Sequence, residues 1–162
     1  MDAEVTKTGS IAEQILPFNE SVGYQIRLTH RLMQRYLQQT IEPHGVTLGM
    51  WYFLRALWHQ DGLTQRELSV IVGTMEPTTL TAIKSMERSG IVSRVRNEED
   101  RRKINIFLTP RGKALKESLL PLARAVVDNS VLGFDDGQRH EFLQYLNAIQ
   151  RNLLERIGPL PE

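Results

Sequence analysis

Apolar residues recur along most of the chain at helical spacing, and one central region alternates in the manner of a β-hairpin. The periodic segments predict helices within residues 21–45, 47–62, 64–73, 74–90, 110–131 and 135–157. The alternating segments 91–96 and 104–109 predict two strands joined by the loop "NEEDRRK". The predicted order is therefore four helices, one hairpin and two further helices.

Residues that start and stop helices support these boundaries. Thr64 and Glu67 have the spacing of a capping box, in which each side chain accepts a hydrogen bond from a free backbone N–H of the other residue. Pro77 suits a first helical turn and Gly90 suits a helix end. In the helices at 64–73 and 74–90, the residues expected to face the core are Leu68, Ile71, Val72, Thr79, Ala82, Ile83 and Met86.

Two short helices, a turn with glycine and a following hairpin describe a winged helix-turn-helix. The predicted fold class is mainly α (α+β), with extra helices at both ends. We expect a flexible N-terminal arm at 1–20, a winged helix-turn-helix at 46–109, and a helical dimerisation region at 21–45 and 110–162. The last helix carries an apolar seam that needs a facing helix, formed by Phe142, Leu146, Ile149, Leu153 and Ile157.

The charge of the chain is nearly balanced overall but unevenly distributed. The formal net charge of the 162 residues is +1, yet the segment 84–103 holds seven basic residues against four acidic ones. The absence of cysteine excludes disulfides, thiolate nucleophiles and cysteine-based redox sensing. The sequence contains neither a membrane-length apolar run nor a secretory signal pattern, so we expect a soluble, cytoplasmic protein.

Residue types that carry catalysis or bind metal ions are present but not suitably arranged. The four histidines, His30, His44, His59 and His140, have no metal-ligand spacing. The adjacent Asp135 and Asp136 are explained by the start of a helix. Nucleophile, phosphate-loop and dinucleotide motifs are missing. We therefore expect no enzyme activity, no cofactor and no metal site.

The hairpin loop holds the densest charge cluster of the chain. Charged loop residues can simply be solvated and keep the edge of a sheet from aggregating. The alternative is a wing whose arginine enters the narrow minor groove of A·T-rich DNA. In that case Asp100 would hold the guanidinium of a neighbouring arginine in place before DNA arrives.

The segment "DRRKINIFLTPRG" resembles the wing signature of the MarR family of bacterial transcription regulators. The matching positions are Asp100, Arg102, Leu108, Thr109 and Gly112. "LTQRELS" and "TTLTAIKSMERSGIVSR" are similar to the two helices of the family's helix-turn-helix. Met86 replaces the usual leucine, and Met50 stands where glutamine is frequent. The resemblance covers roughly residues 22–157.

This resemblance implies a homodimer that binds double-stranded DNA at a pseudo-palindromic operator. The first, fifth and sixth helices of such proteins interlock between subunits. Many relatives release DNA when they bind a small aromatic or acidic molecule, so a ligand-responsive repressor is expected. The alternative left open is a winged-helix subunit that binds proteins and not DNA.

We predict DNA contacts from three parts of the chain: the start of helix 64–73, the outward face of helix 74–90, and the wing. The residues are Thr64, Gln65, Arg66, Thr78, Thr81, Lys84, Ser85, Arg94, Arg96, Arg101, Arg102 and Lys103. Arg102 is the residue expected in the minor groove, and Asp100 is expected to orient it. For each threonine a solvated surface position is an equal alternative. Arg94 or Arg96 could instead structure the hairpin through Asp100.

A ligand site is expected between the dimerisation helices and the winged domain. The predicted residues are Arg27, His30, Trp51, Tyr52, Arg55 and Trp58. Aromatic rings would hold an apolar ligand body, and arginine would pair with a carboxylate or phosphate. The alternative for Trp51 and Trp58, seven residues apart, is a place in the core.

Overall fold

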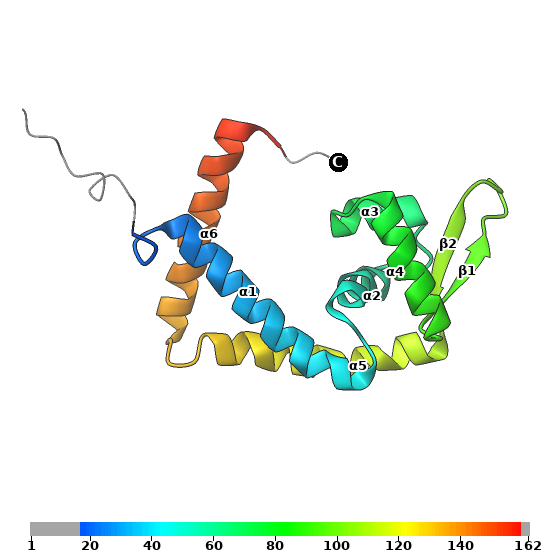
Figure 1. Ribbon diagram of the computed structural model, residues 1–162, viewed down its shortest axis with the longest axis horizontal. Coiled ribbons are helices and arrows are strands. Elements are labelled where there is room, and N and C mark those ends of the chain that lie inside the picture. Colours follow the sequence, from blue (N-terminus) through cyan, green and yellow to red (C-terminus); the bar gives the residue numbers. More distant parts are fainter. Residues whose placement is uncertain (1–16, 160–162) are drawn as a thin grey trace, which may run out of the picture.

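The computed structural model describes residues 17–159, and the winged domain and the terminal helices lie at different ends of it (Figure 1). The elements are α1 (Val22–Ile41), η2 (Glu42–His44), α2 (Leu48–His59), α3 (Gln65–Val72), α4 (Glu76–Arg88), β1 (Val92–Arg96), β2 (Ile104–Leu108), α5 (Pro110–Ser130) and α6 (Asp136–Ile157). The predicted mainly helical class with a two-stranded wing is confirmed. Most of the predicted N-terminal arm, residues 1–16, lies outside the described residues.

Threonine side chains cap three of the helices in the winged half. Thr47, Thr64 and Thr109 accept hydrogen bonds from backbone N–H groups at the starts of α2, α3 and α5. The predicted capping box of α3 is confirmed, since both of its hydrogen bonds are present. These local bonds explain why the helices begin where the sequence pattern places them.

The segment between α2 and α3 is hydrogen-bonded to β2 and so joins the hairpin to the helix-turn-helix. β1 and β2 pair antiparallel, with Val92 opposite Leu108 and Arg96 opposite Ile104. On the other side of β2, the Gly62 N–H donates to the Ile106 carbonyl at 3.0 Å. The Ile106 N–H in turn donates to the Leu63 carbonyl at 2.8 Å. The base of the wing is therefore fixed to the connection between α2 and α3.

The start of α5 packs closely against the winged domain. A Cβ atom added to Gly112 would lie 2.2 Å from the carbonyl oxygen of Ile91, so only glycine fits at this approach. The indole N–H of Trp58 donates to the Gly112 carbonyl at 2.9 Å. This junction connects the winged domain to the helix that continues toward α6 (Figure 1).

One predicted core residue of α3 is wrong. Leu68 is buried and Val72 is half-buried, but the side chain of Ile71 is 58% exposed. Residues four positions apart lie on the same helix face, so Leu68 and Val72 share the inward face of this two-turn helix. Ile71 lies about 100° around the helix from Val72 and points outward.

The terminal helices leave many apolar side chains uncovered in the single chain. α1 packs along α5, and the Asn129 side-chain amide donates to the Tyr36 hydroxyl at 2.9 Å. α6 has no buried residue along its 22 positions. Phe142, Leu153 and Ile157 of the predicted seam are exposed. The winged half has a closed core, whereas α6 does not.

Candidate nucleic-acid interface

The helix α4 presents a polar face outward and an apolar face inward. Thr79, Ile83 and Met86 are completely buried. Thr78, Thr81 and Lys84 are exposed, and Ser85 is half-buried. Thr78, Thr81 and Ser85 line an open hollow of about 350 Å³ together with the start of α2. The predicted outward residues therefore share one accessible surface, as a recognition helix requires.

A hydrogen bond inside the winged domain joins α4 to the turn that precedes it. The hydroxyl groups of Thr74 and Thr79 lie 2.8 Å apart, and Thr79 is fully buried. A buried hydroxyl needs such a partner, because an unpaired one would carry its full desolvation penalty. Thr74 belongs to the turn between α3 and α4, so this bond connects the turn to the recognition helix.

The wing exposes an arginine that its own loop holds in place. The side chain of Arg102 is 92% exposed, whereas that of Asp100 is 29% exposed. The Arg102 Nε donates to Asp100 Oδ1 at 3.1 Å, and Nη2 donates to Asp100 Oδ2 at 3.5 Å. These bonds, together with the backbone N–H of Arg102, hold the pKa of Asp100 below its usual value. The carboxylate thus faces a guanidinium group that remains open to a partner.

The other wing cations differ in their surroundings. Arg94 is only 25% exposed at its side chain and forms an ion pair with Glu87 of α4, with a separation of 3.7 Å. Arg94 therefore ties the hairpin to α4, and its partner is Glu87 and not Asp100. Arg96, Arg101 and Lys103 are exposed. These three remain accessible to phosphate groups.

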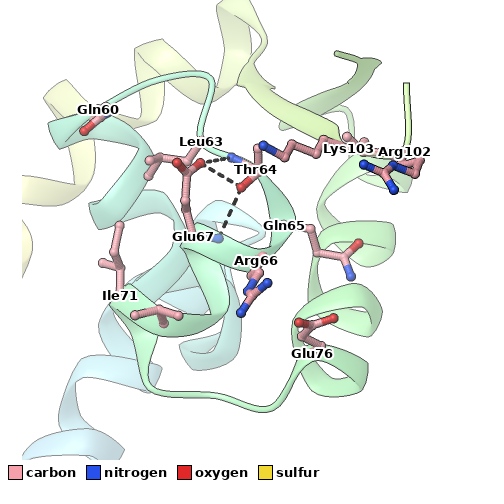
Figure 2. Close-up of a pocket in the computed structure, with 12 residues that line it drawn as sticks. Gln60, Leu63, Thr64, Gln65, Arg66, Glu67, Ile71, Glu76, Arg102 and Lys103 are labelled. Carbon is pink, nitrogen blue, oxygen red and sulfur yellow. Dashed lines mark hydrogen bonds between the residues drawn. The ribbon is translucent and has the colours of Figure 1, made fainter. Parts of the chain in front are cut away.

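The start of α3 faces a wide depression beside the wing (Figure 2). This depression, of about 890 Å³, brings together the predicted residues Thr64, Gln65, Arg66, Arg102 and Lys103. Glu67 also lies here and accepts a hydrogen bond from the Thr64 N–H at 2.7 Å. Hydrogen bonds from the backbone and hydroxyl of Thr64 lower the pKa of Glu67. The α3 terminus is already capped, so the cationic groups available at this edge are the side chains of Arg66, Arg102 and Lys103.

The structure does not gather the six predicted ligand residues into one site. Tyr52 and Arg55 line a cavity of about 430 Å³ between α2 and α3, together with His59 and Ile71. His59 is not among the residues predicted for this site, although its spacing from Tyr52 and Arg55 places all three on one face of α2. Arg27 and His30 are exposed on α1 and do not line this cavity.

Trp51 lies in the core and the half-buried Trp58 packs against it, which corrects their assignment to the ligand site. Trp51 is 3% exposed, and the two indole rings meet edge to face with their centroids 5.7 Å apart. The Trp58 N–H is already bonded to Gly112. Both rings are therefore used in packing α2 against its neighbours, and the sequence alternative of a core position was the correct one.

Over residues 17–159, clusters of three or more histidine, aspartate or glutamate side chains suited to a metal ion are absent. In the same part of the chain, none of the helices is both long and apolar enough to cross a membrane.

Comparison with known proteins assigns this arrangement to a family. The sequence profile described as the MarR family matches residues 46–104, which hold the helix-turn-helix, β1 and the wing loop. The crystal structure of a MarR transcriptional regulator from Methanosarcina mazei Go1 is 34% identical in sequence, with a TM-score of 0.74. That similarity covers 84% of this chain and 98% of the other. The chain belongs to the MarR family.

Two further proteins are similar to this chain, one in sequence and one in fold. The HTH-type transcriptional regulator TtmR of Methylorubrum extorquens is 28% identical over 124 residues, or 76% of this chain, and the match spans 63% of TtmR. The structure of Bordetella bronchiseptica BpsR is similar to this chain with a TM-score of 0.71. The DNA binding of BpsR is regulated by 6-hydroxynicotinic acid. BpsR is 23% identical and covers 80% of this chain and 98% of its own.

The protein is thus a DNA-binding transcriptional regulator of the MarR family and not an enzyme. This assignment favours the regulator over the protein-binding subunit that the sequence left open. The exposed polar face of α4 and the exposed Arg102 are the features that suit DNA.

Proposed function

We propose that the protein is a homodimeric repressor that binds a pseudo-palindromic operator and leaves it when a small aromatic or acidic ligand binds. The observation that carries the DNA-binding part of this proposal is the exposed Arg102 of the wing, which is paired with Asp100. The helix α4 would enter a major groove, and Arg102 would enter the adjacent minor groove. Arg96, Arg101 and Lys103 would meet phosphate groups.

Dimerisation is supported by the apolar residues that the terminal helices leave exposed. α1 exposes Val22 and Ile26, and α6 exposes Phe142, Leu153 and Ile157. Exposed apolar residues repeated along a helix mark an interaction surface. A second copy would cover them and would present two wings to two half-sites of one duplex.

The cavity beside α2 supports a ligand of small size and negative charge. Arg55 and His59 offer cationic or donor groups, and Ile71 and Val72 offer apolar surface. An aromatic carboxylate combines both requirements. The regulation of BpsR by 6-hydroxynicotinic acid supports this chemical class by analogy.

The DNA part of the proposal is tested with Arg102→Ala. We expect operator affinity to fall by about 1–3 kcal/mol, because one cation and its groove contacts are lost. The measurement is a titration of the upstream DNA of the gene at fixed salt concentration. Arg124→Ala, which removes the same charge from an exposed position on α5, should bind like the wild type. Equal affinity of the Arg102 variant and the wild type would contradict the proposed role.

The ligand part is tested by thermal-shift screening of benzoate, nicotinate and 6-hydroxynicotinate. A ligand that binds the folded state raises the melting temperature, and an inducer must also release operator DNA in the titration. Arg55→Ala should abolish both responses while leaving operator affinity unchanged. A melting response that survives this substitution would place the ligand elsewhere.

A further inference from the structure

The wing contains a pair of asparagines, Asn97 directly after β1 and Asn105 within β2, whose side-chain amides form a connected series of hydrogen bonds. The Asn105 side-chain N–H donates to the Gly62 carbonyl at 2.7 Å. The Asn97 side-chain N–H donates to Asn105 Oδ1 at 2.9 Å. Asn97 Oδ1 accepts the backbone N–H groups of Glu99 and Asp100, each at 2.9 Å. The series ends at Asp100, which holds Arg102.

Both ends of this series have a defined role in the structure. Gly62 follows α2 and is fixed to β2 by its own N–H. The nearest atom of the Phe107 ring lies 2.6 Å from the position that a Cβ of Gly62 would take. Gly62 is therefore a rigid point of the winged domain. At the other end the side chain of Arg102 is almost fully exposed. The asparagine pair spans the distance between the rigid base and the exposed tip.

We propose that Asn97 and Asn105 are positioning residues that set the direction of Arg102 before DNA binds. A hairpin loop held only by its two strand ends would sample many conformations, and each would have to be lost on binding. Asn97 organises the loop through two backbone N–H groups, and Asn105 joins that loop to the α2–α3 connection. Neither asparagine needs to touch DNA.

This inference rests on the proposed role of Arg102, and it makes a distinct prediction. Asn105→Ala should weaken operator binding by about threefold to tenfold, the range expected from the ordering of one long side chain. In an Arg102→Ala background the same substitution should change affinity by less than about twofold, since the group that it positions is gone. A purely structural role would weaken both backgrounds equally.

Two companion variants separate the parts of the series. Asn97→Ser keeps a hydroxyl acceptor for the loop N–H groups but lacks the amide that reaches Asn105, so it should resemble Asn105→Ala. Ser93→Ala changes an exposed polar residue of β1, outside the series, and should bind like the wild type. All variants should keep the wild-type melting temperature within about 3 °C.

Hydrogen exchange provides a readout that does not depend on DNA. The peptide covering 97–103 should exchange faster in Asn105→Ala and Asn97→Ser, while the peptide covering α4 should be unchanged. Unchanged exchange in the wing loop, or equal loss of affinity in both backgrounds, would overturn the inference. An Arg102→Ala variant with wild-type affinity would instead reject the proposed function and the inference together.

Discussion

The helices α2 and α6 differ in how far their apolar side chains are buried within the chain. α2 has 12 residues, of which six are buried among α3, α4 and the hairpin. α6 has 22 residues and no buried one, although its capping box is complete. The start of α6 is thus specified locally, whereas the apolar side chains of its seam are at most half-buried within residues 17–159.

This contrast indicates that the stability of the fold and the stability of the proposed dimer depend on different regions of the chain. The winged domain obtains its stability from a core closed within the chain, so its integrity should depend on close packing. The proposed dimer would instead draw on the exposed seam of α6, so its integrity should depend on the chemistry of that surface. Substitutions in the two regions should therefore fail in different ways.

The largest effect is expected where α5 meets the winged domain. Gly112→Ala should lower the free energy of unfolding by at least about 3 kcal/mol, because the new methyl group meets the Ile91 carbonyl oxygen. The measurement is chemical denaturation followed by circular dichroism. Gly23→Ala in α1, where a Cβ meets no atom within 4 Å, should leave the protein at least as stable as the wild type. Equal midpoints for both variants would contradict the packing argument.

A smaller and different effect is expected in the seam of α6. Leu153→Lys should weaken the proposed dimer by about 2–4 kcal/mol while the helical signal of the winged domain remains. Analytical ultracentrifugation over a range of concentrations measures the shift. Gln150→Lys adds the same charge at an exposed polar position of α6 and serves as the control. A dimer unaffected by the change at position 153 would show that the seam is not the interface.

The hydrogen bond between the hydroxyl groups of Thr74 and Thr79 provides a test of packing within the winged domain. Thr79→Val keeps the shape but removes the bond to Thr74, and should lower the free energy of unfolding by about 1 kcal/mol. Thr79→Ser retains the hydroxyl and should weaken operator binding less than Thr79→Val does. Parallel denaturation and DNA titration distinguish a loss of stability from a loss of orientation. If both variants bind DNA equally, the hydroxyl bond has no orienting role.

The smallest effect is a pH dependence at the start of α3. The folded pKa of Glu67 lies below its ordinary value of 4.5, so the ionised form is favoured in the folded state. This contribution to stability is present above pH 4.5 and is lost as the pH falls through the lower folded value. In the Glu67→Gln variant the melting temperature should therefore depend less on pH than in the wild type between pH 5 and pH 3, about the range in which carboxylates titrate. Glu117→Gln on the exposed side of α5 should retain the wild-type profile.

Local signals predicted a large part of this fold. The expected strands at 91–96 and 104–109 differ from β1 and β2 by one residue at one end each. The capping box of Thr64 and Glu67 is present as expected. Such features depend on residues three or four positions apart, so they can be recognised without tertiary contacts.

The location of a side chain was harder to predict from the sequence where two different surroundings suited its residue type. Ile71 fits a helical stripe, yet it is 58% exposed, because Leu68, Ser69 and Val72 form the inward face of α3. Trp51 and Trp58 fitted a ligand pocket as well as a core. The burial of Trp51 and the bond from Trp58 to Gly112 of α5 assign both rings to packing. Arg94 fitted both DNA and a carboxylate, and the partner that it meets, Glu87, comes from another element.

The sequence by itself determined the order of elements, their caps and the resemblance of the wing to the MarR signature, because these are encoded in short stretches. Only the tertiary structure decided which polar groups meet across elements. Asn105 reaches Gly62 over 43 positions, and Trp58 reaches Gly112 over 54. Such bonds form when distant segments are brought together by burial of a shared core, which no local pattern specifies.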